Sequence, residues 1–568
     1  MMAPQHLFIS QYITAINNRI FKIDKVVAGL LRFVRLLPNL CFMRYLMLLC
    51  GCFFTFLSFT QTIAGANGEQ FTERVVASHL SDPWEVTYGP DGYLWITEAK
   101  GYMVSRINSA TGKKTVVLDV SAQRQFPRYD KMKEAAGEKP WPQGGLMGLA
   151  LHPQLLSGKP YVYIAYHYRF AGAADTSKGC AINFGGCFYT ARIVRYEYDR
   201  QAQQLIRPQI LCDSIPASSD HDGGRLLIAS VNAKNYLFHS IGDMGAGQFG
   251  NAGRTNHAQQ KDDYEGKILR FNTEPDGDTN AYDKWIPNDN PFSDQKQNAV
   301  YSYGHRNPQG LAYAIVGGIG RMYESEHGPY SDDEVNIIEK GKNYGHPLVL
   351  GYADGNYDGL AAGVTSHQSL PGIWQTTYPT IGSETENAKR IGNDYRDPIL
   401  TLYPNTHSFL TTLYDSIKID TGKQEWASEA PSSIEVYTSD AIPGWKNSLL
   451  LPSLKNGHLI RLNLNENGTG ITGDTVCYFK AQVRYRDIAI SPDGKTIYVV
   501  TDSASVSSGP SAEDPKQVSY KGCLLAFHYE VKNEVASSKN LFPKKEEVAG
   551  DKVIYKREKP ITKQKSLP

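Results

Sequence analysis

Short apolar runs that end at turn residues recur along most of this chain. The clearest example is 81–98, where two apolar runs flank the turn Pro90-Asp91-Gly92, and a close copy occupies 486–501 around Pro492-Asp493-Gly494. An apolar run, a tight turn and a second apolar run predict a β-hairpin. The two ends of the chain are therefore predicted to be built from the same unit.

Weaker copies of this unit lie between the two ends. They pair 148–153 with 161–165, 225–229 with 236–243, and 309–313 with 322–326. Strand, turn and strand at irregular intervals are typical of a β-propeller with long loops between its blades. No sustained helical periodicity competes with this pattern. A pair of β-sandwiches is the alternative, because short strands alone do not separate the two architectures.

The first 66 residues differ from the rest. From Met43 the chain has a basic start, an apolar middle and small residues at Ala64 and Ala66, which is the layout of a secretory signal. We therefore predict that 1–66 is an upstream segment with a signal peptide beginning at Met43, and that the protein is periplasmic or secreted. An uncleaved membrane anchor is the alternative, since the apolar run is nearly long enough to span a bilayer.

The propeller is predicted to occupy 67–534, followed by a charged, disordered tail at 535–568. From Lys539 onward the tail has nine Lys or Arg against four Asp or Glu, with too few apolar residues to form a core. The whole chain is almost neutral, with 59 Lys and Arg against 58 Asp and Glu. This balance gives no electrostatic reason to expect nucleic acid as a partner.

Five cysteines follow the predicted signal, and their number is odd. Cys180 and Cys187 flank a six-residue loop that a disulfide could close in an oxidising compartment. The others are Cys212, Cys477 and Cys523. At least one thiol is therefore expected to be free or paired between chains, and the absence of a CxxC pair disfavours zinc.

His221 is the strongest catalytic candidate. It lies between Asp220 and Asp222 and precedes two glycines, so it belongs to a turn in which a carboxylate can set its tautomer and basicity. Asp243 ends the next predicted strand of the same hairpin and is the candidate orienting partner. The alternative is a histidine that only caps a turn.

Basic and acidic side chains gather in three further segments. Arg484 and Arg486 alternate along a predicted strand and so share a face, where two guanidinium groups could grip the carboxylates of one rigid ligand. Arg306 and Asn307 stand in 303–310, shortly before the acidic segment 324–334, whose oxygens suit a hard cation such as calcium. An anionic ligand and a metal are therefore predicted to bind close together.

These segments together resemble a known family, the soluble, secreted sugar dehydrogenases that use pyrroloquinoline quinone (PQQ). The resemblance runs from about residue 81 to 532 and rests on seven motifs in the family's order: 142–150, 220–225, 241–243, 304–310, 326–329 with 331–334, 452–455 and 484–486. It implies an all-β fold, a six-bladed β-propeller with long loops between the blades.

The resemblance also implies a role for each matching residue. His221 would be the general base for the C1 hydroxyl of the sugar, supported by Asp243, with Gln143 and Asp220 near the substrate. The PQQ would be held by Gln143, Arg306, Asn307, Lys455, Arg484 and Arg486, with Arg306 also stabilising the charge of the reduced quinone. Trp426 would line the sugar pocket.

Two calcium ions are implied as well. The carbonyl groups of Gly328 and Pro329 would bind the calcium that polarises PQQ. A second, structural calcium would take Glu334, Tyr344, Tyr352 and Asp354 with the carbonyl of Leu350. The remaining acids of 332–334 are predicted to shape the loop.

The activity implied is oxidation of glucose-like aldoses to lactones, with electrons passed to an external cytochrome or quinone; the family also forms homodimers. The sequence departs from the family on the substrate side, at 424–426 and 244–251, which leaves the sugar open. Two other classes remain as alternatives: a non-catalytic calcium-binding propeller that binds a glycan or protein, and a calcium-dependent propeller hydrolase acting on lactones.

Overall fold

The computed structural model describes residues 61–124, 144–168, 189–218, 220–248, 251–279, 282–294, 296–421, 424–503 and 519–531, all within one unit. The predicted segment before Gln61, the charged tail, Gln143 and the candidate disulfide between Cys180 and Cys187 lie outside these residues. The other three cysteines of the predicted mature chain are free thiols.

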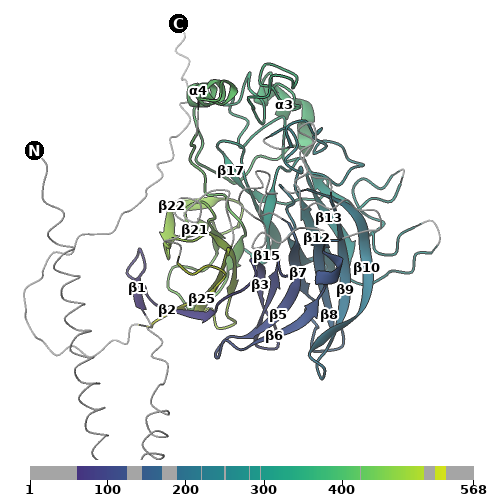
Figure 1. Ribbon diagram of the computed structural model, residues 1–568, viewed down its shortest axis with the longest axis vertical. Helices are drawn as coiled ribbons and strands as arrows, with labels where there is room; N and C mark the ends of the chain where they lie inside the picture. Colours follow the sequence, from purple (N-terminus) through teal and green to yellow (C-terminus); the bar gives the residue numbers. More distant parts are fainter. Residues whose placement is uncertain are drawn as a thin grey trace, which may run out of the picture. The chain divides into compact units, whose positions relative to one another are not determined.

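Six antiparallel sheets make up the described chain, which confirms the all-β, six-bladed β-propeller (Figure 1). Blade 1 comprises β3 (Pro83–Tyr88), β4 (Tyr93–Glu98), β5 (Met103–Asn108) and β6 (Lys114–Asp119). Blade 2 comprises β7 (Leu146–Leu151), β8 (Tyr161–His167), β9 (Tyr189–Asp199) and β10 (Gln204–Ala217). Blade 3 comprises β11 (Leu226–Val231), β12 (Lys234–Ile241), β13 (Lys267–Asn272) and β14 (Val300–Tyr303). Blade 4 comprises β15 (Pro308–Val316), β16 (Ile319–Glu326), β17 (Asp333–Ile337) and β18 (Leu400–Leu402). Blade 5 comprises β19 (Glu435–Tyr437), β20 (Ser448–Pro452), β21 (Leu459–Leu464) and β22 (Ile471–Tyr478). Blade 6 comprises β23 (Tyr485–Ile490), β24 (Thr496–Thr501), β25 (Leu524–Tyr529), β2 (Gln70–Ala77) and β1 (Gln61–Ala64).

The first strand of each blade contacts the first strand of the next, and β23 returns to β3, so the sheets close into a ring. The hairpins predicted from the sequence are the first two strands of their blades: β3–β4, β7–β8, β11–β12, β15–β16 and β23–β24. Neighbouring blades contact one another along these strands, so many of their apolar side chains are buried. The core accordingly lies between adjacent blades, where Trp95 of β4, Tyr163 of β8 and Leu237 of β12 belong to one buried cluster.

The ring is closed by pairing the two ends of the described chain. Strand β2 pairs antiparallel with β25, with Phe71 opposite Tyr529. Phe71 is fully buried, and its ring centroid lies 4.8 Å from that of Phe479 and 5.7 Å from that of Trp445. Strand β1, which pairs with β2, lies inside the segment predicted to belong to the signal. Cleavage after Ala66 would remove β1 and leave the closing strand intact.

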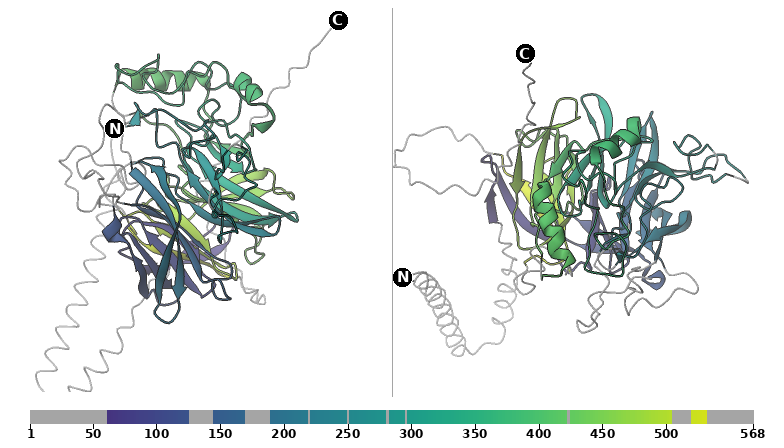
Figure 2. Two further views of the ribbon diagram at one scale, coloured as in Figure 1. Left: turned by 90° about the vertical axis from the view of Figure 1, so that its right-hand side faces the viewer. Right: turned by 90° about the horizontal axis from the view of Figure 1, so that it is seen from above.

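A long inserted region between β17 and β19, interrupted by β18 of blade 4, covers one end of the ring. It contains two helices that the strand pattern did not predict, α3 (Glu384–Ile391) and α4 (His407–Lys418), each begun by a side-chain cap, Ser383 and Thr406. The helices lie at the same end of the molecule in Figures 1 and 2. Tyr414 of α4 packs its ring against Tyr330, just after β16, with centroids 5.1 Å apart. The described residues also include two short 3₁₀ helices, η1 (Ser121–Gln123) and η6 (Gly392–Asp394).

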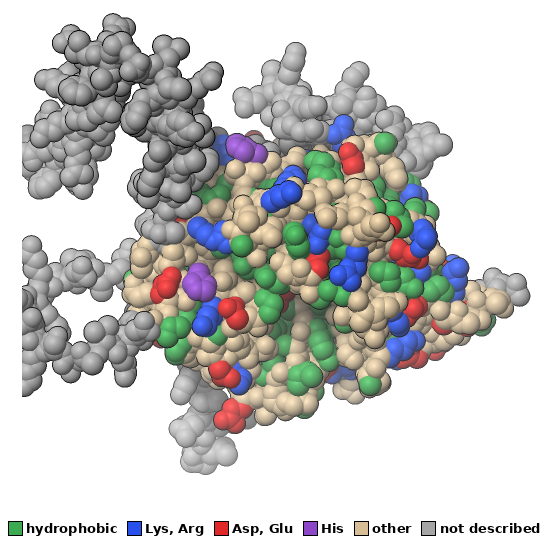
Figure 3. Space-filling view, turned by 90° about the horizontal axis from the view of Figure 1, so that it is seen from below, with side chains coloured by type: hydrophobic (Ala, Val, Ile, Leu, Met, Phe, Trp, Pro, Cys, Tyr) green, Lys and Arg blue, Asp and Glu red, His purple; other side chains and the backbone are tan. Residues whose placement is uncertain are grey.

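The opposite end of the molecule shows basic and acidic side chains interspersed around a shallow hollow (Figure 3). Among the described residues, no helix has the length and apolar character needed to cross a bilayer.

A buried ion pair in blade 5 links stability to pH. Nε2 of His458 lies 2.9 Å from Oε2 of Glu429 and 3.8 Å from the thiol of Cys477. Burial opposes the imidazolium, but the contacts with Cys477 and Glu429 outweigh it and raise the pKa of His458 to about 9.

We therefore expect the stabilisation from His458 to be complete near pH 6, below the histidine's ordinary pKa, and to be lost as the pH rises through about 9. Thermal unfolding of the wild type and of His458→Asn should differ most at pH 6 and converge by about pH 10. A difference in melting temperature that stays constant over this range would contradict the charged pair.

Candidate active site

The loop before β11 and the loop after β12 bring His221 and Asp243 together. The Nδ1 atom of His221 lies 2.7 Å from Oδ1 of Asp243, and both side chains are buried. His221 has a φ of 50°, in the left-handed region where a non-glycine residue is strained. The predicted pairing is therefore present, in a conformation that the surrounding structure has to maintain.

Asp243 accepts hydrogen bonds from five groups. Besides His221 they are the backbone N–H of Gly245, the amide of Asn256, Nε2 of His346 and the hydroxyl of Tyr378, at 2.8–3.0 Å. Burial alone would raise the pKa of Asp243, but His221 and His346 lower it below its ordinary range. Asp243 is therefore a fixed carboxylate that holds the proton of His221 on Nδ1.

The other ring nitrogen of His221 faces Gln248. The amide nitrogen of Gln248 lies 2.7 Å from Nε2 of His221, and its Oε1 accepts a hydrogen bond of 2.8 Å from Arg306. The Arg306 contact fixes which end of the amide is oxygen, so Gln248 donates to Nε2. The lone pair with which His221 can act as a base is thus on Nε2, and Gln248 links this nitrogen to the guanidinium of Arg306.

Arg306 and Asn307 lie close to His221 because the backbone segments that carry them pack tightly at Gly242. The N–H of Asp243 donates to the carbonyl of Arg306 at 2.8 Å, and a Cβ at Gly242 would lie 2.1 Å from the carbonyl oxygen of His221. Only glycine fits there. Nε of Arg306 and the amide nitrogen of Asn307 are buried donors that have no partner among the described residues.

Three arginine side chains lie near this point, Arg306, Arg484 and Arg486. Burial and the nearby charges, that of Arg306 above all, hold the pKa of His327 well below its ordinary value. Arg484 and Arg486 both bind Asp502, with Nε–carboxylate distances of 2.9 and 2.8 Å, which confirms that they share a face. The positive potential and the unpartnered donors suit an anionic ligand.

Lys455 and Trp426 contact each other. The ammonium of Lys455 donates to the carbonyl of Trp426 and lies 5.2 Å from the centre of its ring. The Trp426 ring also packs edge-on against Tyr330, with centroids 4.9 Å apart. Asp220 is buried beside His221, and burial raises its pKa although His221 and Arg306 act in the opposite direction.

The turn at Gly328 and Pro329 is held by Asp333. One oxygen of Asp333 accepts from the N–H of Gly328 at 2.9 Å, and the other accepts from Ser428, Glu429 and Ala430 at 2.8–3.0 Å. A Cβ at Gly328 would lie 1.8 Å from the carbonyl oxygen of Ser331. The two carbonyl oxygens of the turn accept no hydrogen bond from a described residue, so they can serve a cation.

The residues expected around a structural cation lie on β17 and in the loop that follows it. Gly351 donates to Glu334 at 2.9 Å, and the N–H of Asp354 bonds the carbonyl of Tyr352 at 2.8 Å. The Tyr344 hydroxyl is already used, because it donates to the carbonyl of Ile337; only its backbone oxygen remains for a metal.

Glu384 joins this cluster and was not predicted from the sequence. It accepts hydrogen bonds from the N–H groups of Leu350, Gly355 and Tyr357 at 2.9–3.2 Å, and burial raises its pKa to about 8. Burial also raises the pKa of Glu334 and Asp354. Glu334 and Glu384 are buried and pair with no Lys or Arg of the described chain, whereas Asp354 is exposed, so the two buried acids fit a cation.

Sequence reasoning also missed Gln248, Asn256, His346, Tyr378 and Asp502. Asn256, His346 and Tyr378 stand between 13 and 135 positions from Asp243, and no local pattern links them to it. Only Gln248 and Asp502 carried a signal, since both follow strands that were predicted.

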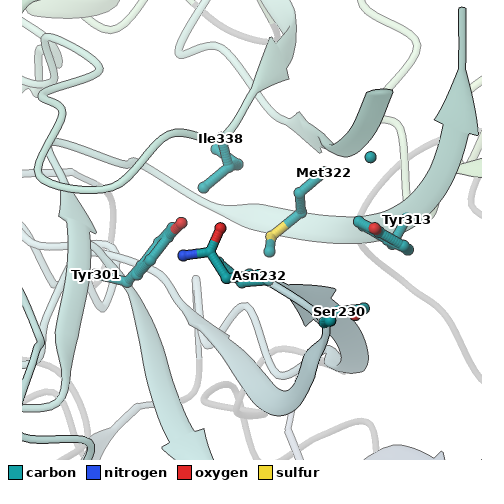
Figure 4. A pocket seen from close by; sticks show the side chains of 9 residues that line it. Ser230, Asn232, Tyr301, Tyr313, Met322 and Ile338 are labelled. Atoms are coloured by element: carbon teal, nitrogen blue, oxygen red, sulfur yellow. The ribbon is translucent and has the colours of Figure 1, made fainter. Parts of the chain in front are cut away.

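A separate cavity of about 330 Å³ lies at the seam between blades 3 and 4, where the β11–β12 turn meets β16. Tyr301, Tyr313, Asn232 and Met322 line it (Figure 4). It contains none of the residues described above.

Comparison with known proteins places these residues in context. The family model described as glucose/sorbosone dehydrogenase matches residues 80–382 and 417–507. The chain is 32% identical over 488 residues to quinoprotein glucose dehydrogenase B of Acinetobacter calcoaceticus, covering 83% of this chain and 93% of that protein. It is 25% identical over 437 residues to aldose sugar dehydrogenase YliI of Escherichia coli strain K12, covering 76% and 90% of the two chains.

Solved structures share the fold. The PQQ-bound aldose sugar dehydrogenase of Streptomyces coelicolor aligns with a TM-score of 0.51 at 23% identity, covering 80% of this chain and 97% of that one. The apo form of the soluble aldose sugar dehydrogenase of Escherichia coli aligns with a TM-score of 0.53 at 21% identity, covering 81% and 100%.

The four hydrogen bonds of Asp333 predict a large effect on stability. Asp333→Ala would leave buried backbone donors unpaired, and we expect the free energy of unfolding to fall by about 3–5 kcal/mol in a denaturant titration. The matched control is Asp440→Ala, because the Asp440 side chain is 79% exposed and only pairs with Lys446. Equal effects of the two substitutions would show that Asp333 does not hold the turn.

Proposed function

The chain belongs to the glucose/sorbosone dehydrogenase family and is a PQQ-dependent sugar dehydrogenase; we propose that it oxidises the C1 hydroxyl of glucose-like aldoses to lactones, with His221 as the general base. The observation that carries this proposal is the tautomer of the His221 ring. Its Nδ1 is paired with Asp243, and its Nε2 presents a lone pair within 2.7 Å of the Gln248 amide.

Oxidation at C1 requires removal of a proton and a hydride. His221 takes the proton from the hydroxyl at Nε2, and Asp243 stabilises the resulting imidazolium through Nδ1. The hydroxyl must displace the Gln248 amide from Nε2, because a base accepts a proton only at hydrogen-bond distance. Asp220, next to His221, and Gln143, which lies outside the described residues, would hold other hydroxyl groups of the sugar, with Trp426 as an apolar wall.

When bound, the quinone supplies the acceptor for the hydride. The residues that fit it are Arg306, Asn307, Lys455, Arg484 and Arg486, with Gln143. The unpartnered donors of Arg306 and Asn307 are the structural reason, because a buried donor is costly unless a ligand accepts from it. Asp502 binds the Nε atoms of both Arg484 and Arg486, which places the two guanidinium groups side by side for the carboxylates of one ligand.

Calcium is part of the same proposal. The carbonyl oxygens of Gly328 and Pro329 would hold a calcium that acts as a Lewis acid beside the cofactor. Glu334, Asp354 and the carbonyls of Tyr344, Leu350 and Tyr352 would hold a second, structural calcium, to which we add Glu384. The buried acids Glu334 and Glu384, which pair with no Lys or Arg among the described residues, support this second site.

We further propose that the propeller of 67–534 is exported under a signal beginning at Met43 and passes its electrons to an external acceptor. The support is the basic, apolar and small-residue layout of 43–66.

Replacing the base should abolish turnover while leaving the cofactor bound. We expect protein reconstituted with calcium and PQQ to reduce a dye with aldoses as substrate, and His221→Ala to lower kcat by about 10²–10⁴. Quinone titration should give nearly the same affinity for both proteins. The matched control is His528→Ala, an exposed histidine on β25, which should retain wild-type turnover.

Other results would point elsewhere. Wild-type protein that binds PQQ but oxidises no aldose or other polyol would disprove the proposed reaction. Hydrolysis of lactones with calcium alone would indicate a hydrolase, and the absence of any quinone absorption change would indicate a propeller that only binds a partner.

Arg486 is expected to contribute to cofactor affinity rather than to chemistry. Arg486→Met should weaken PQQ binding about 10- to 100-fold, the cost of one charge-assisted contact, without a matching rise in the KM for the aldose. Lys389→Met on α3 is the control, because its side chain is 75% exposed. The measurement is a titration of metal-loaded apoprotein with quinone; unchanged affinity would remove Arg486 from the cofactor site.

A further inference from the structure

Blade 4 contains a group of buried acids that neither the base nor the proposed calcium ligands explain. Glu324 and Glu326 alternate along β16 and so lie on one face of the sheet, opposite Asn336 and Glu334 of β17. All four side chains are buried, and Glu324 and Asn336 have no exposed area. His305, in the loop before β15, is also fully buried and lies against this face.

Three ligand-type side chains converge there. Ligand atoms of His305, Glu324 and Glu326 all lie within 4.8 Å of one another. Ligands around one divalent cation at about 2.0–2.4 Å are separated by no more than about this distance. Nδ1 of His305 is 3.3 Å from Oε1 of Glu326.

The group lacks a balancing charge. Among the described residues, the only ion-pair partner of these carboxylates is His305, and no Lys or Arg contacts them. The Oε1 atom of Glu324 is buried without a hydrogen-bond partner. Burial and the charges of Glu326 and Glu334 raise the pKa of Glu324 well above its ordinary value, so an ionised Glu324 needs a cation beside it.

The surrounding contacts orient the ligands as they do in metal sites. Nε2 of His305 lies 2.9 Å from Oγ of Ser302, and the ring stacks on Tyr344 with centroids 4.6 Å apart. The tautomer that donates from Nε2 to Ser302 leaves the lone pair of Nδ1 facing the carboxylates. The amide of Asn336 donates to Glu324 at 3.0 Å and to Glu334 at 3.0 Å, which separates Glu324 from the proposed structural calcium.

We propose that His305, Glu324 and Glu326 bind a divalent cation inside blade 4, separate from both proposed calcium ions. One imidazole nitrogen and two carboxylates form a mixed ligand set, which suits Mn²⁺ or Zn²⁺ better than Ca²⁺ or Mg²⁺. The other oxygen of Glu326 accepts from the backbone N–H groups of Arg306 and Asn307 at 2.6 and 3.1 Å. The cation would therefore sit directly behind the loop that carries these two residues.

The test is metal content, which does not depend on sugar oxidation. Full-length protein carrying PQQ and excess Ca²⁺ is incubated with Mn²⁺, desalted and analysed by mass spectrometry of the metals. We expect the wild type to retain about one Mn²⁺ per chain and Glu324→Gln to lose it. Glu435→Gln, a glutamate on β19 in another blade, is the matched control and should retain it. Equal Mn²⁺ in the wild type and Glu324→Gln would overturn the proposal.

A second measurement uses only the wild type, in case Glu324→Gln fails to fold. Crystals grown with Mn²⁺ should show an anomalous difference peak between His305, Glu324 and Glu326. A map with manganese peaks elsewhere and none at this position would also overturn the proposal, and would indicate that Glu324 is simply protonated.

Discussion

The carboxylate of Asp243 is the point on which the site depends. It is fully buried and receives hydrogen bonds from five groups that come from the loop before β11, from the loop after β12, from the loop after β17 and from the inserted segment before α3. A buried carboxylate is stable only when its oxygens are satisfied. The hydrogen bonds that stabilise the buried charge of Asp243 also fix where His221, His346 and Tyr378 lie. The insertion is therefore anchored to blade 3 by Asp243, the residue that orients His221.

The second constraint is the concentration of positive charge opposite this carboxylate. Burial lowers the pKa of His327, and the charges of Arg306, Arg486 and Arg484 lower it further. Such charges repel one another in a buried place unless acids compensate for them. Asp502 does this for Arg484 and Arg486, whereas the side chain of Arg306 bonds, within the described chain, only the neutral groups of Gln248 and the His327 carbonyl. Arg306 is thus the cation left to meet the charge of an anionic cofactor, which agrees with its place next to the base.

The fold was largely predictable because its unit is local. The β3–β4 and β23–β24 hairpins are visible from two apolar runs and a Pro-Asp-Gly turn, and their repetition indicates a propeller. The insertion was not predictable in the same way. Helices α3 and α4 are short, and their positions depend on contacts such as Tyr414 with Tyr330 and the carbonyl of Ala361, far away in the sequence.

The sequence by itself determined which chemical groups are present and the order in which they occur: a histidine between two aspartates, an Arg-Asn pair in a tight turn, an Arg-x-Arg strand and an acidic loop. Residue type and short-range spacing contain that information. Only the tertiary structure decided that Gln248 occupies Nε2 of His221, that Tyr378 reaches Asp243 across 135 positions, and that Glu384 joins Glu334 and Asp354. These contacts arise when the ring closes and the insertion packs over it, and burial then makes each unpaired donor or charge costly enough to require a specific partner.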